Sequence, residues 1–255
     1  MRKKRQVEWR TNVREICKMR VLVACEESQR VCMAFRAKGH EAYSCDIQEC
    51  SGGHPEWHIQ GDVLKILNPK DHYSKMGDSI MFKTCDGVNH EIIGKWDMII
   101  AHPPCTFLTV AANKLYNVEK YGEKAIKRLE DREKAKEFFM AFVNADCDKK
   151  VIENPIGIMS TYYRKPDQII QPYQFGHPYR KSTCLWLFGV QPLVPTNIVD
   201  FECIHSNGKS GGYSGASWVV RDENGKILSY NDPRVGVIRS KTYTGIAQAF
   251  ADQWG

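Results

Sequence analysis

The sequence alternates short apolar runs with helical segments, and this alternation limits the folds open to the chain. Five segments have the composition or the boundaries of strands: residues 20–24, 41–45, 61–63, 96–101 and 150–155. Between the first two, residues 27–38 place Val31, Ala34 and Phe35 on one helical face and stop at Gly39. Strands that alternate with helices build a parallel sheet with right-handed crossovers. We therefore expect an α/β fold with a doubly wound, mostly parallel sheet.

The remaining segments complete this prediction. Residues 79–93 are typical of a hairpin that turns at residues 85–87, and residues 217–230 of a second hairpin. Residues 118–144 predict a long charged helix, and the chain ends in a helix over residues 244–254. We expect the long helix to bury Ile126, Leu129, Ala135, Phe138, Phe139 and Phe142, and the last helix Ile246, Ala249, Phe250 and Gln253.

The chain divides into four predicted parts. Residues 1–19 form a basic N-terminal tail, and residues 20–190 form the main α/β domain. Residues 191–239 form a small β-rich insertion, which includes a Gly/Ser-rich stretch. Residues 240–255 return to the main domain as its last helix.

Composition restricts the location and the partners of the protein. The 255 residues contain no apolar run long enough to cross a membrane and no visible signal peptide, so we expect no membrane partner. Ten cysteines without a regular framework fit a reducing, cytoplasmic location. A net charge of +6 permits nucleic-acid binding without establishing it. We expect a monomer.

Two predicted strands end in groups that suit covalent chemistry. The run at residues 96–101 is followed by His102, two prolines and Cys105, and the run at residues 150–155 ends in Glu153, Asn154 and a proline. Ligands of open α/β sheets bind at the carboxyl ends of the strands, so a thiol and a carboxyl group would meet there. This pair suits nucleophilic addition to an electron-poor ring. Taken singly, Cys105 could be a buried structural cysteine and Glu153 a helix cap.

Acidic residues end the first three predicted strands and suit an adenosyl ligand. Asp46 lies about 20 positions past the first strand, where a carboxylate can bind a ribose diol, and Asp62 could accept from an adenine amino group. Neither of the glycine patterns that bind phosphates is present. An adenosyl ligand without a pyrophosphate, such as S-adenosylmethionine, fits this layout. Each carboxylate alone could equally be a helix cap.

The order of these motifs resembles the DNA cytosine-5 methyltransferase family. Residues 101–105, Ala-His-Pro-Pro-Cys, are similar to its Gly-Gly-Pro-Pro-Cys nucleophile loop, and residues 153–155 to its Glu-Asn-Val motif. Gly-Asp-Val at 61–63 is similar to the family's Gly-Asp-Ile. Residues 175–178 and 246–251 resemble its Tyr-Gly-x-Pro segment and its closing helix. The resemblance implies a class I S-adenosylmethionine-dependent methyltransferase-like fold that modifies C5 of cytosine in DNA.

The layout and the resemblance together assign three sets of residues. The catalytic set is Cys105, Glu153, Asn154 and Lys181. The set for S-adenosylmethionine is Glu26, Ser28, Asp46, Ile47, Asp62, Val63, Pro103, Ser240 and Thr242. The set for the DNA substrate is Thr106, Arg180, Lys181, Lys209 and Tyr213. No metal ion is expected.

The implied chemistry requires a particular protonation state of each catalytic group. The Cys105 thiolate would add to C6 of cytosine, so we expect positive potential near it, such as the N-terminus of a following helix. Glu153 would protonate N3, which requires burial to raise its pKa toward neutrality. Water would take the C5 proton, and the target base would be flipped out of the duplex.

The sequence also departs from the family pattern. The glycine-rich first motif is replaced by residues 24–28, Ala-Cys-Glu-Glu-Ser, and the usual Gln after the cysteine is Thr106. The Gln-x-Arg-x-Arg segment is Tyr-Arg-Lys-Ser-Thr at 179–183, and Ser240 stands where Asn is usual. Residues 189–239 leave little room for a large target-recognition domain. These departures indicate a reduced, divergent member, of the type found in phages and restriction-modification systems.

Four alternatives stay open. Cys45, Cys50, His54 and His58 have a spacing close to that of a zinc finger. An amino-methyltransferase would share the sheet, but it uses an aromatic residue where Cys105 stands. The same scaffold could modify a free cytosine nucleotide or transfer a group other than methyl. A non-catalytic DNA-binding protein would tolerate loss of Cys105.

Overall fold

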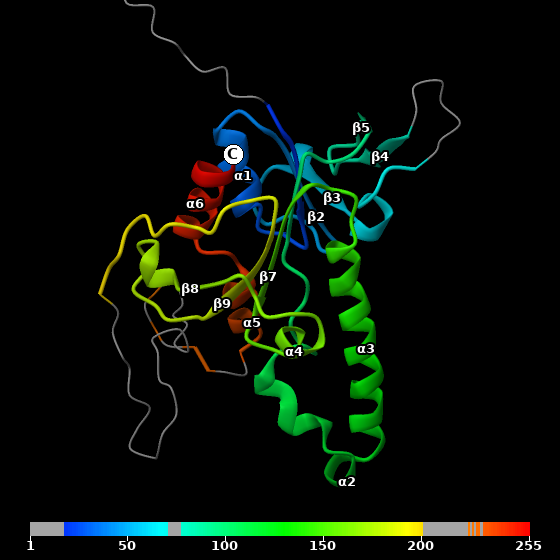
Figure 1. Ribbon diagram of the computed structural model, residues 1–255, viewed down its shortest axis with the longest axis vertical. Coiled ribbons are helices and arrows are strands. Elements are labelled where there is room, and N and C mark those ends of the chain that lie inside the picture. Colours follow the sequence, from blue (N-terminus) through cyan, green and yellow to red (C-terminus); the bar gives the residue numbers. More distant parts are fainter. Residues whose placement is uncertain (1–17, 71–77, 201–223, 225, 227, 230–231) are drawn as a thin grey trace, which may run out of the picture.

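The computed structural model describes residues 18–70, 78–200, 224, 226, 228–229 and 232–255. These residues form a seven-stranded sheet in the order β3-β2-β1-β6-β7-β9-β8, together with a separate two-stranded sheet, β4-β5 (Figure 1). The strands are β1 (Arg20–Ala24), β2 (Glu41–Asp46), β3 (His58–Gln60), β4 (Ser79–Lys83), β5 (Asn89–Ile93), β6 (Met98–Ala101), β7 (Lys149–Pro155), β8 (Gln168–Ile170) and β9 (Thr183–Phe188). The α-helices are α1 (Arg30–Ala37), α2 (Val118–Tyr121), α3 (Glu123–Val143), α4 (Met159–Tyr162), α5 (Pro233–Ser240) and α6 (Thr244–Trp254). Four 3-10 helices are η1 (Pro55–Trp57), η2 (Val63–Lys65), η3 (Val110–Tyr116) and η4 (Pro172–Gln174).

The large sheet is mostly parallel, as the alternation predicts. Strands β3, β2, β1, β6 and β7 run parallel, whereas β9 is antiparallel to both β7 and β8. The chain moves outward from β1 through β2 to β3 and then returns to β6 on the other side of β1. The order of the strands therefore reverses between β1 and β6, which is where open α/β sheets bind ligands.

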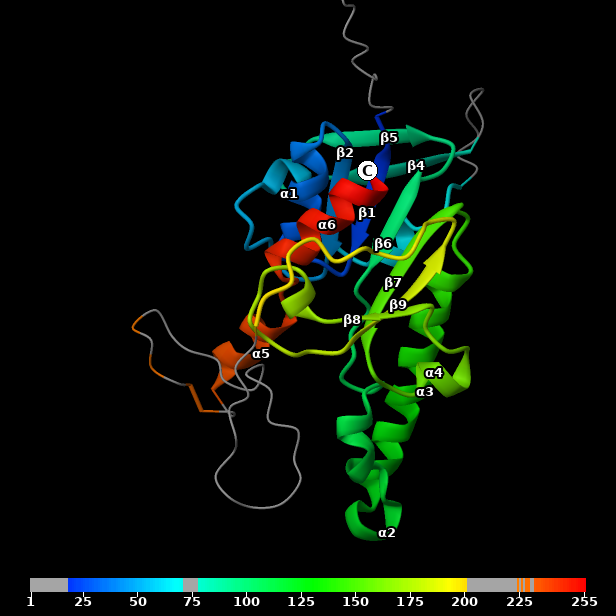
Figure 2. The ribbon, with the colours of Figure 1, turned by 60° about the vertical axis from the view of Figure 1, so that its left-hand side comes forward.

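Each face of the sheet has its own core because successive strand side chains point to opposite faces. Val21 and Val23 of β1 belong to the core that α1 and α6 cover. Leu22 and Ala24 belong to the core that α3 and the β4–β5 hairpin cover. Figure 2 shows α1 and α6 side by side on one face and α3 on the other. The sheet is thus buried on both faces, which explains why its strands are so apolar.

The first predicted helix is wrong at its start. It begins at Arg30 and not at residue 27. Cys25 and Gln29 have φ angles of 59° and 58°, so the chain turns through left-handed conformations before the helix begins. The sequence does not show this turn because neither position is a glycine.

The long predicted helix is two helices, and its buried stripe is partly wrong. Gly122, with φ 53°, separates α2 from α3. Phe139 and Phe142 are fully buried as predicted, but Ile126 and Leu129 are 48% and 37% exposed. The reason is visible in Figure 1, where the first half of α3 projects beyond the sheet and has no core beneath it.

The last helix, α6, has the predicted bounds and buries Ile246, Ala249 and Phe250 as predicted. Gln253 does not face inward: it is exposed, and its amide is hydrogen-bonded to the backbone of Val194. The predicted hairpin at residues 79–93 is confirmed as β4 and β5. The predicted tail, the Gly/Ser-rich stretch and most of the second hairpin lie outside the described residues, as do Lys209 and Tyr213. Among the described helices none is long and apolar enough to cross a membrane.

Candidate functional site

The ends of β6 and β7 bring the predicted thiol and carboxyl group to one edge of the sheet. Ala101, the last residue of β6, pairs in register with Ile152, so His102 lies beside Glu153, which β7 carries near its end. His102 Nδ1 donates to Glu153 Oε2 at 3.3 Å. Cys105 follows within three residues, half-buried beyond the two prolines.

The two loops that follow these strands are paired with each other. Thr109 and Gly157 form a β-bridge, and the Ile158 amide donates to the Leu108 carbonyl at 2.8 Å. A Cβ atom at Gly157 would overlap the Leu108 carbonyl oxygen, so only a glycine permits this approach. The pairing fixes the position of Cys105 relative to Glu153.

Lys181 is another member of the predicted catalytic set, and it comes from a segment other than β6 and β7. It lies just before β9, and its Nζ donates to the backbone oxygen of Arg239, at the end of α5, at 3.1 Å. Its positive charge lowers the pKa of both Cys105 and Glu153. Lys181 thus adds a positive charge that favours the ionised form of both groups.

The protonation of Glu153 differs from the prediction. Burial alone would raise the pKa of its carboxyl group, but the hydrogen bond from His102, the charge of His102 and that of Lys181 together hold the pKa below its usual value. Glu153 is therefore ionised at neutral pH. The prediction considered burial and missed the neighbouring imidazole.

The protonation of Cys105 also differs from the prediction. Burial, followed by the charge of Glu153, raises its thiol pKa, and Lys181 and Arg239 offset this effect only in part. The described chain has no α-helix directly after Cys105: the Leu108 and Thr109 amides donate to the Cys105 carbonyl in a turn, and the 3-10 helix η3 follows at Val110. The thiol is thus protonated at neutral pH.

Asn154 is hydrogen-bonded to the loop that carries Cys105. Its Nδ2 donates to the carbonyl of Pro103 at 2.7 Å. Its Oδ1 is buried and has no hydrogen-bond partner among the described residues. Asn154 and Pro103 therefore link β7 to the loop that carries Cys105.

His102 contacts Glu153 in the candidate site, and the sequence prediction gave it no role. Its Nδ1 lies 3.3 Å from Glu153 Oε2, and its charge also opposes the effect of burial, which raises the pKa of Glu26. Its Nε2 is buried without a hydrogen-bond partner among the described residues. The available signal was the departure from the family pattern, in which a glycine occupies this position.

Glu26, which was predicted to bind the cofactor, also accepts hydrogen bonds from the start of α1. Its two carboxylate oxygens accept from the amides of Val31 at 2.7 Å and Cys32 at 3.2 Å, in the first turn of α1. Burial raises its pKa, and His102 and these amides oppose the increase. Ser28 is buried in the same turn.

Asp46, Ile47 and Asp62 lie together at the carboxyl ends of β2 and β3. The Gly61 amide donates to the Asp46 carbonyl at 2.8 Å. The thiol pKa of Cys25, which follows β1, is raised mainly by burial and in addition by the charges of Asp46 and Asp62. Each carboxylate also accepts a local amide: Asp46 from Gln48, and Asp62 from Leu64 at the start of η2. Ile47 is 77% exposed beside them, whereas Val63 is buried.

The segment that contains Ser240 and Thr242 reaches the same side of the sheet. Arg30 Nη1 donates to the Thr242 carbonyl at 2.6 Å, and Lys241 Nζ donates to Ser51 Oγ at 2.9 Å. Ser240 itself is exposed and bonds within α5. The segment between α5 and α6 therefore contacts the start of α1 and the loop after β2, near the predicted cofactor residues.

The zinc alternative has no support in the described residues, where no group of three or more metal-ligating side chains comes together. The ring nitrogens of His58 are hydrogen-bonded to Ser44 Oγ and to the Gln48 carbonyl. His54 Nδ1 is hydrogen-bonded to Glu56.

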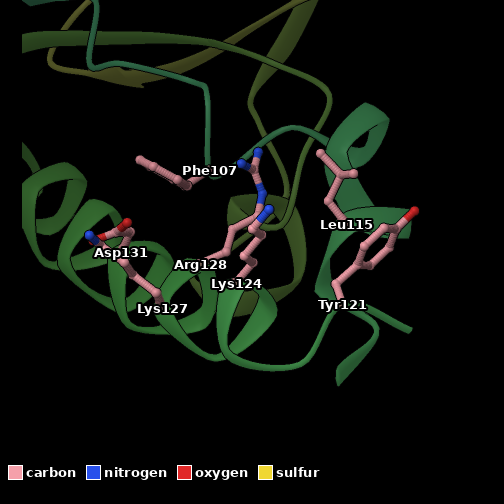
Figure 3. A pocket seen from close by; sticks show the side chains of 7 residues that line it. All are labelled: Phe107, Leu115, Tyr121, Lys124, Lys127, Arg128 and Asp131. Carbon is pink, nitrogen blue, oxygen red and sulfur yellow. The ribbon is translucent and has the colours of Figure 1, made fainter. Parts of the chain in front are cut away.

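A pocket of about 400 Å³ lies beside the Cys105 loop (Figure 3). It is lined by Phe107, Leu115, Tyr121, Lys124, Lys127, Arg128 and Asp131. Thr106, predicted to bind the substrate, is exposed next to it, and its carbonyl accepts from Arg128 Nη2 at 3.2 Å. Arg180 is exposed beside Lys181, on the other side of the site.

No family model matches the chain, and none of the curated proteins matches it.

Proposed function

We propose that the protein transfers a methyl group from S-adenosylmethionine to C5 of cytosine in DNA, through a covalent bond between Cys105 Sγ and C6. One observation carries the proposal: Cys105 follows β6, Glu153 lies near the end of the adjacent parallel strand β7, and the charge of Lys181 favours the ionised form of both. Addition to a pyrimidine ring needs a nucleophile, a proton for the ring nitrogen and a nearby positive charge. These three groups can supply them.

The protonation states suggest how the proton for N3 is obtained. Cys105 holds a proton that it must lose, and Glu153 lacks one that it must donate. Transfer of the thiol proton to the Glu153 carboxylate produces the thiolate and the acid together. It also removes the negative charge that disfavours the thiolate.

The remaining steps balance without a further reactant. The thiolate adds to C6 while Glu153 protonates N3, and the resulting enamine makes C5 nucleophilic. S-adenosylmethionine would supply the methyl group: the C5–methyl bond would form as the methyl–sulfonium bond breaks, and S-adenosylhomocysteine would leave. Water then removes the C5 proton, the C6–S bond breaks, and the electron pair returns to Cys105 as the N3 proton is released.

The residues at the switch point fit an adenosyl group. Asp46 and Asp62 place carboxylates at the ends of β2 and β3, and the exposed Ile47 can cover an adenine ring. The doubly wound order of strands supports a class I methyltransferase-like fold. The described cysteines are free thiols, which supports a cytoplasmic location.

The test is incubation with labelled S-adenosylmethionine and DNA, followed by nucleoside analysis. The wild type should produce 5-methylcytosine, and Cys105→Ala should produce none. Cys85→Ala removes an exposed cysteine elsewhere and should keep full activity.

A second measurement tests the covalent intermediate. Fluorine cannot leave from C5 as a cation, so DNA with 5-fluorocytosine should remain attached to Cys105 after methyl transfer. Mass spectrometry of the adduct should identify the Cys105 peptide. Methyl transfer by the alanine variant at the wild-type rate would end the proposal.

A further inference from the structure

The protein has a projecting arm next to its candidate site. The arm consists of η3, α2 and the first half of α3, residues 110–132, and extends away from the sheet in both views (Figures 1 and 2). Ile126 and Leu129 on it are largely exposed, whereas Phe139 and Phe142 further along α3 are buried. The arm therefore contributes little to the core.

The pocket on the arm is basic and partly aromatic. Lys124, Lys127 and Arg128 line it with one acidic residue, Asp131, and the rings of Phe107 and Tyr121 (Figure 3). Lys124 and Lys127 form no ion pair within the described part of the chain. Phe107 and Tyr121 are half-buried, and cations beside such rings suit phosphate groups and stacked bases.

Two arginines connect the arm to the loop that carries Cys105. Arg128 donates to the Thr106 carbonyl at 3.2 Å, and Arg132 Nε donates to the Phe107 carbonyl at 3.2 Å. The Arg132 guanidinium also lies 3.2 Å from the ring centre of Tyr116. A ligand bound in the pocket therefore lies beside the nucleophile loop.

The length of the arm indicates the size of that ligand. At about 1.5 Å per residue, Lys124 lies about 12 Å along α3 from Arg132, which contacts the nucleophile loop. One strand of DNA advances about 3.4 Å per nucleotide, so this distance spans three to four nucleotides. Because Phe107 and Lys124 line the same pocket, a strand that binds along α3 from Arg132 to Lys124 begins beside the Cys105 loop.

From these observations we infer that the arm binds the phosphate backbone of the strand that flanks the target cytosine. The substrate is then a polynucleotide and not a free nucleotide. This inference rests on the proposed function, because it takes Cys105 as the position of the target base. It adds a second contact surface, opposite Arg180 and Lys181.

The experiment measures binding of cytosine-containing oligonucleotides of 3, 6, 12 and 20 nucleotides as a function of salt. All proteins carry Cys105→Ala, so that no turnover occurs. Affinity of the otherwise unchanged protein should rise with length. Lys124→Ala with Lys127→Ala should weaken binding of the 20-mer at least tenfold and leave the trinucleotide unchanged. The slope of log affinity against log salt should fall by roughly 1.4 to 1.8, because each phosphate contact contributes about 0.7 to 0.9.

The matched control is Lys65→Ala with Lys83→Ala, which removes the same charge from exposed positions in η2 and β4. It should bind the 20-mer with the slope of the parent protein. Equal weakening by the two double variants, or a parental slope for Lys124→Ala with Lys127→Ala, would overturn the inference. So would wild-type methylation of free cytosine nucleotides as fast as DNA. Absence of methylation on every cytosine substrate would instead refute the proposed function and leave the binding result standing.

Discussion

Cys105 and Glu153 influence each other's protonation, and His102 shifts the balance between them. The charge of Glu153 raises the pKa of Cys105, in addition to the larger effect of burial. His102 keeps Glu153 ionised in spite of its burial. The pair therefore holds one proton, on sulfur, before substrate binds. This state protects the thiol from oxidation and alkylation, because the thiolate is the reactive form.

Replacement of Glu153 by Gln should separate thiol reactivity from catalysis. Methyl transfer should fall by roughly two orders of magnitude or more, the usual effect of losing a general acid. Alkylation of Cys105 should become faster, because without the negative charge its pKa moves down toward the ordinary value and more thiolate is present at each pH. The pH at which Cys105 reacts at half its maximum rate should therefore decrease.

The measurement is iodoacetamide labelling of Cys105 between pH 6 and 10, read by peptide mass spectrometry. Cys85 in the same sample is the internal control, and its labelling should not change. A Glu153→Gln protein whose Cys105 midpoint moves to higher pH would show that Glu153 does not act on the thiol.

At the scale of elements, the sequence predicts most of the parallel strands but not all of them. The strand predicted at residues 61–63 is wrong, because β3 ends at Gln60 and the 3-10 helix η2 begins at Val63. The run at residues 20–24 is β1 with the same bounds, because a fully buried strand leaves a continuous apolar signal. The start of α1 is not predictable in this way, since Cys25 and Gln29 adopt positive φ angles that other residue types favour. The apolar stripe of α3 fails for Ile126 and Leu129 because periodicity shows an apolar face, not whether a partner covers it. The positions of Cys105 and Glu153 followed from the strand ends, whereas the effect of His102 required three-dimensional distances.

The pairing of the two site loops makes Gly157 a sensitive position. Gly157→Ala should push the Leu108 backbone away and shift Cys105 relative to Glu153. A displacement of about 1 Å at a reacting group can cost about a hundredfold in rate. We expect kcat to fall by about that factor while the affinity for S-adenosylhomocysteine stays within twofold.

Gly236→Ala is the matched control, because a Cβ at this position in α5 meets no atom within 4 Å. Its steady-state kinetics should equal those of the wild type, and its melting temperature should not decrease. Wild-type kcat in the Gly157→Ala protein would mean that the loop pairing does not position Cys105.

The whole molecule separates its charges along the carboxyl edge of the sheet. Asp46 and Asp62 lie beyond β2 and β3, whereas Lys181 and the basic arm lie toward β7 and α3. A positively charged sulfonium ligand and a polyanionic strand would therefore approach from different sides of the switch point. Both would meet at Cys105, in the middle of the sheet. This arrangement predicts that a substitution can abolish binding of one ligand without affecting binding of the other.

Thermal unfolding with S-adenosylhomocysteine tests this separation. A ligand at a hundred times its Kd stabilises the folded state by about 2.7 kcal/mol. At about 2 to 4 °C per kcal/mol for a chain of this size, the melting temperature should rise by roughly 5 to 11 °C in the wild type. Cys105→Ala and Lys124→Ala with Lys127→Ala should show the same rise. Asp46→Ala with Asp62→Ala should lose most of it, because the ribose and adenine contacts are gone, and should still bind a 20-mer oligonucleotide. A full thermal shift in the double aspartate variant would place the adenosyl ligand elsewhere in the protein.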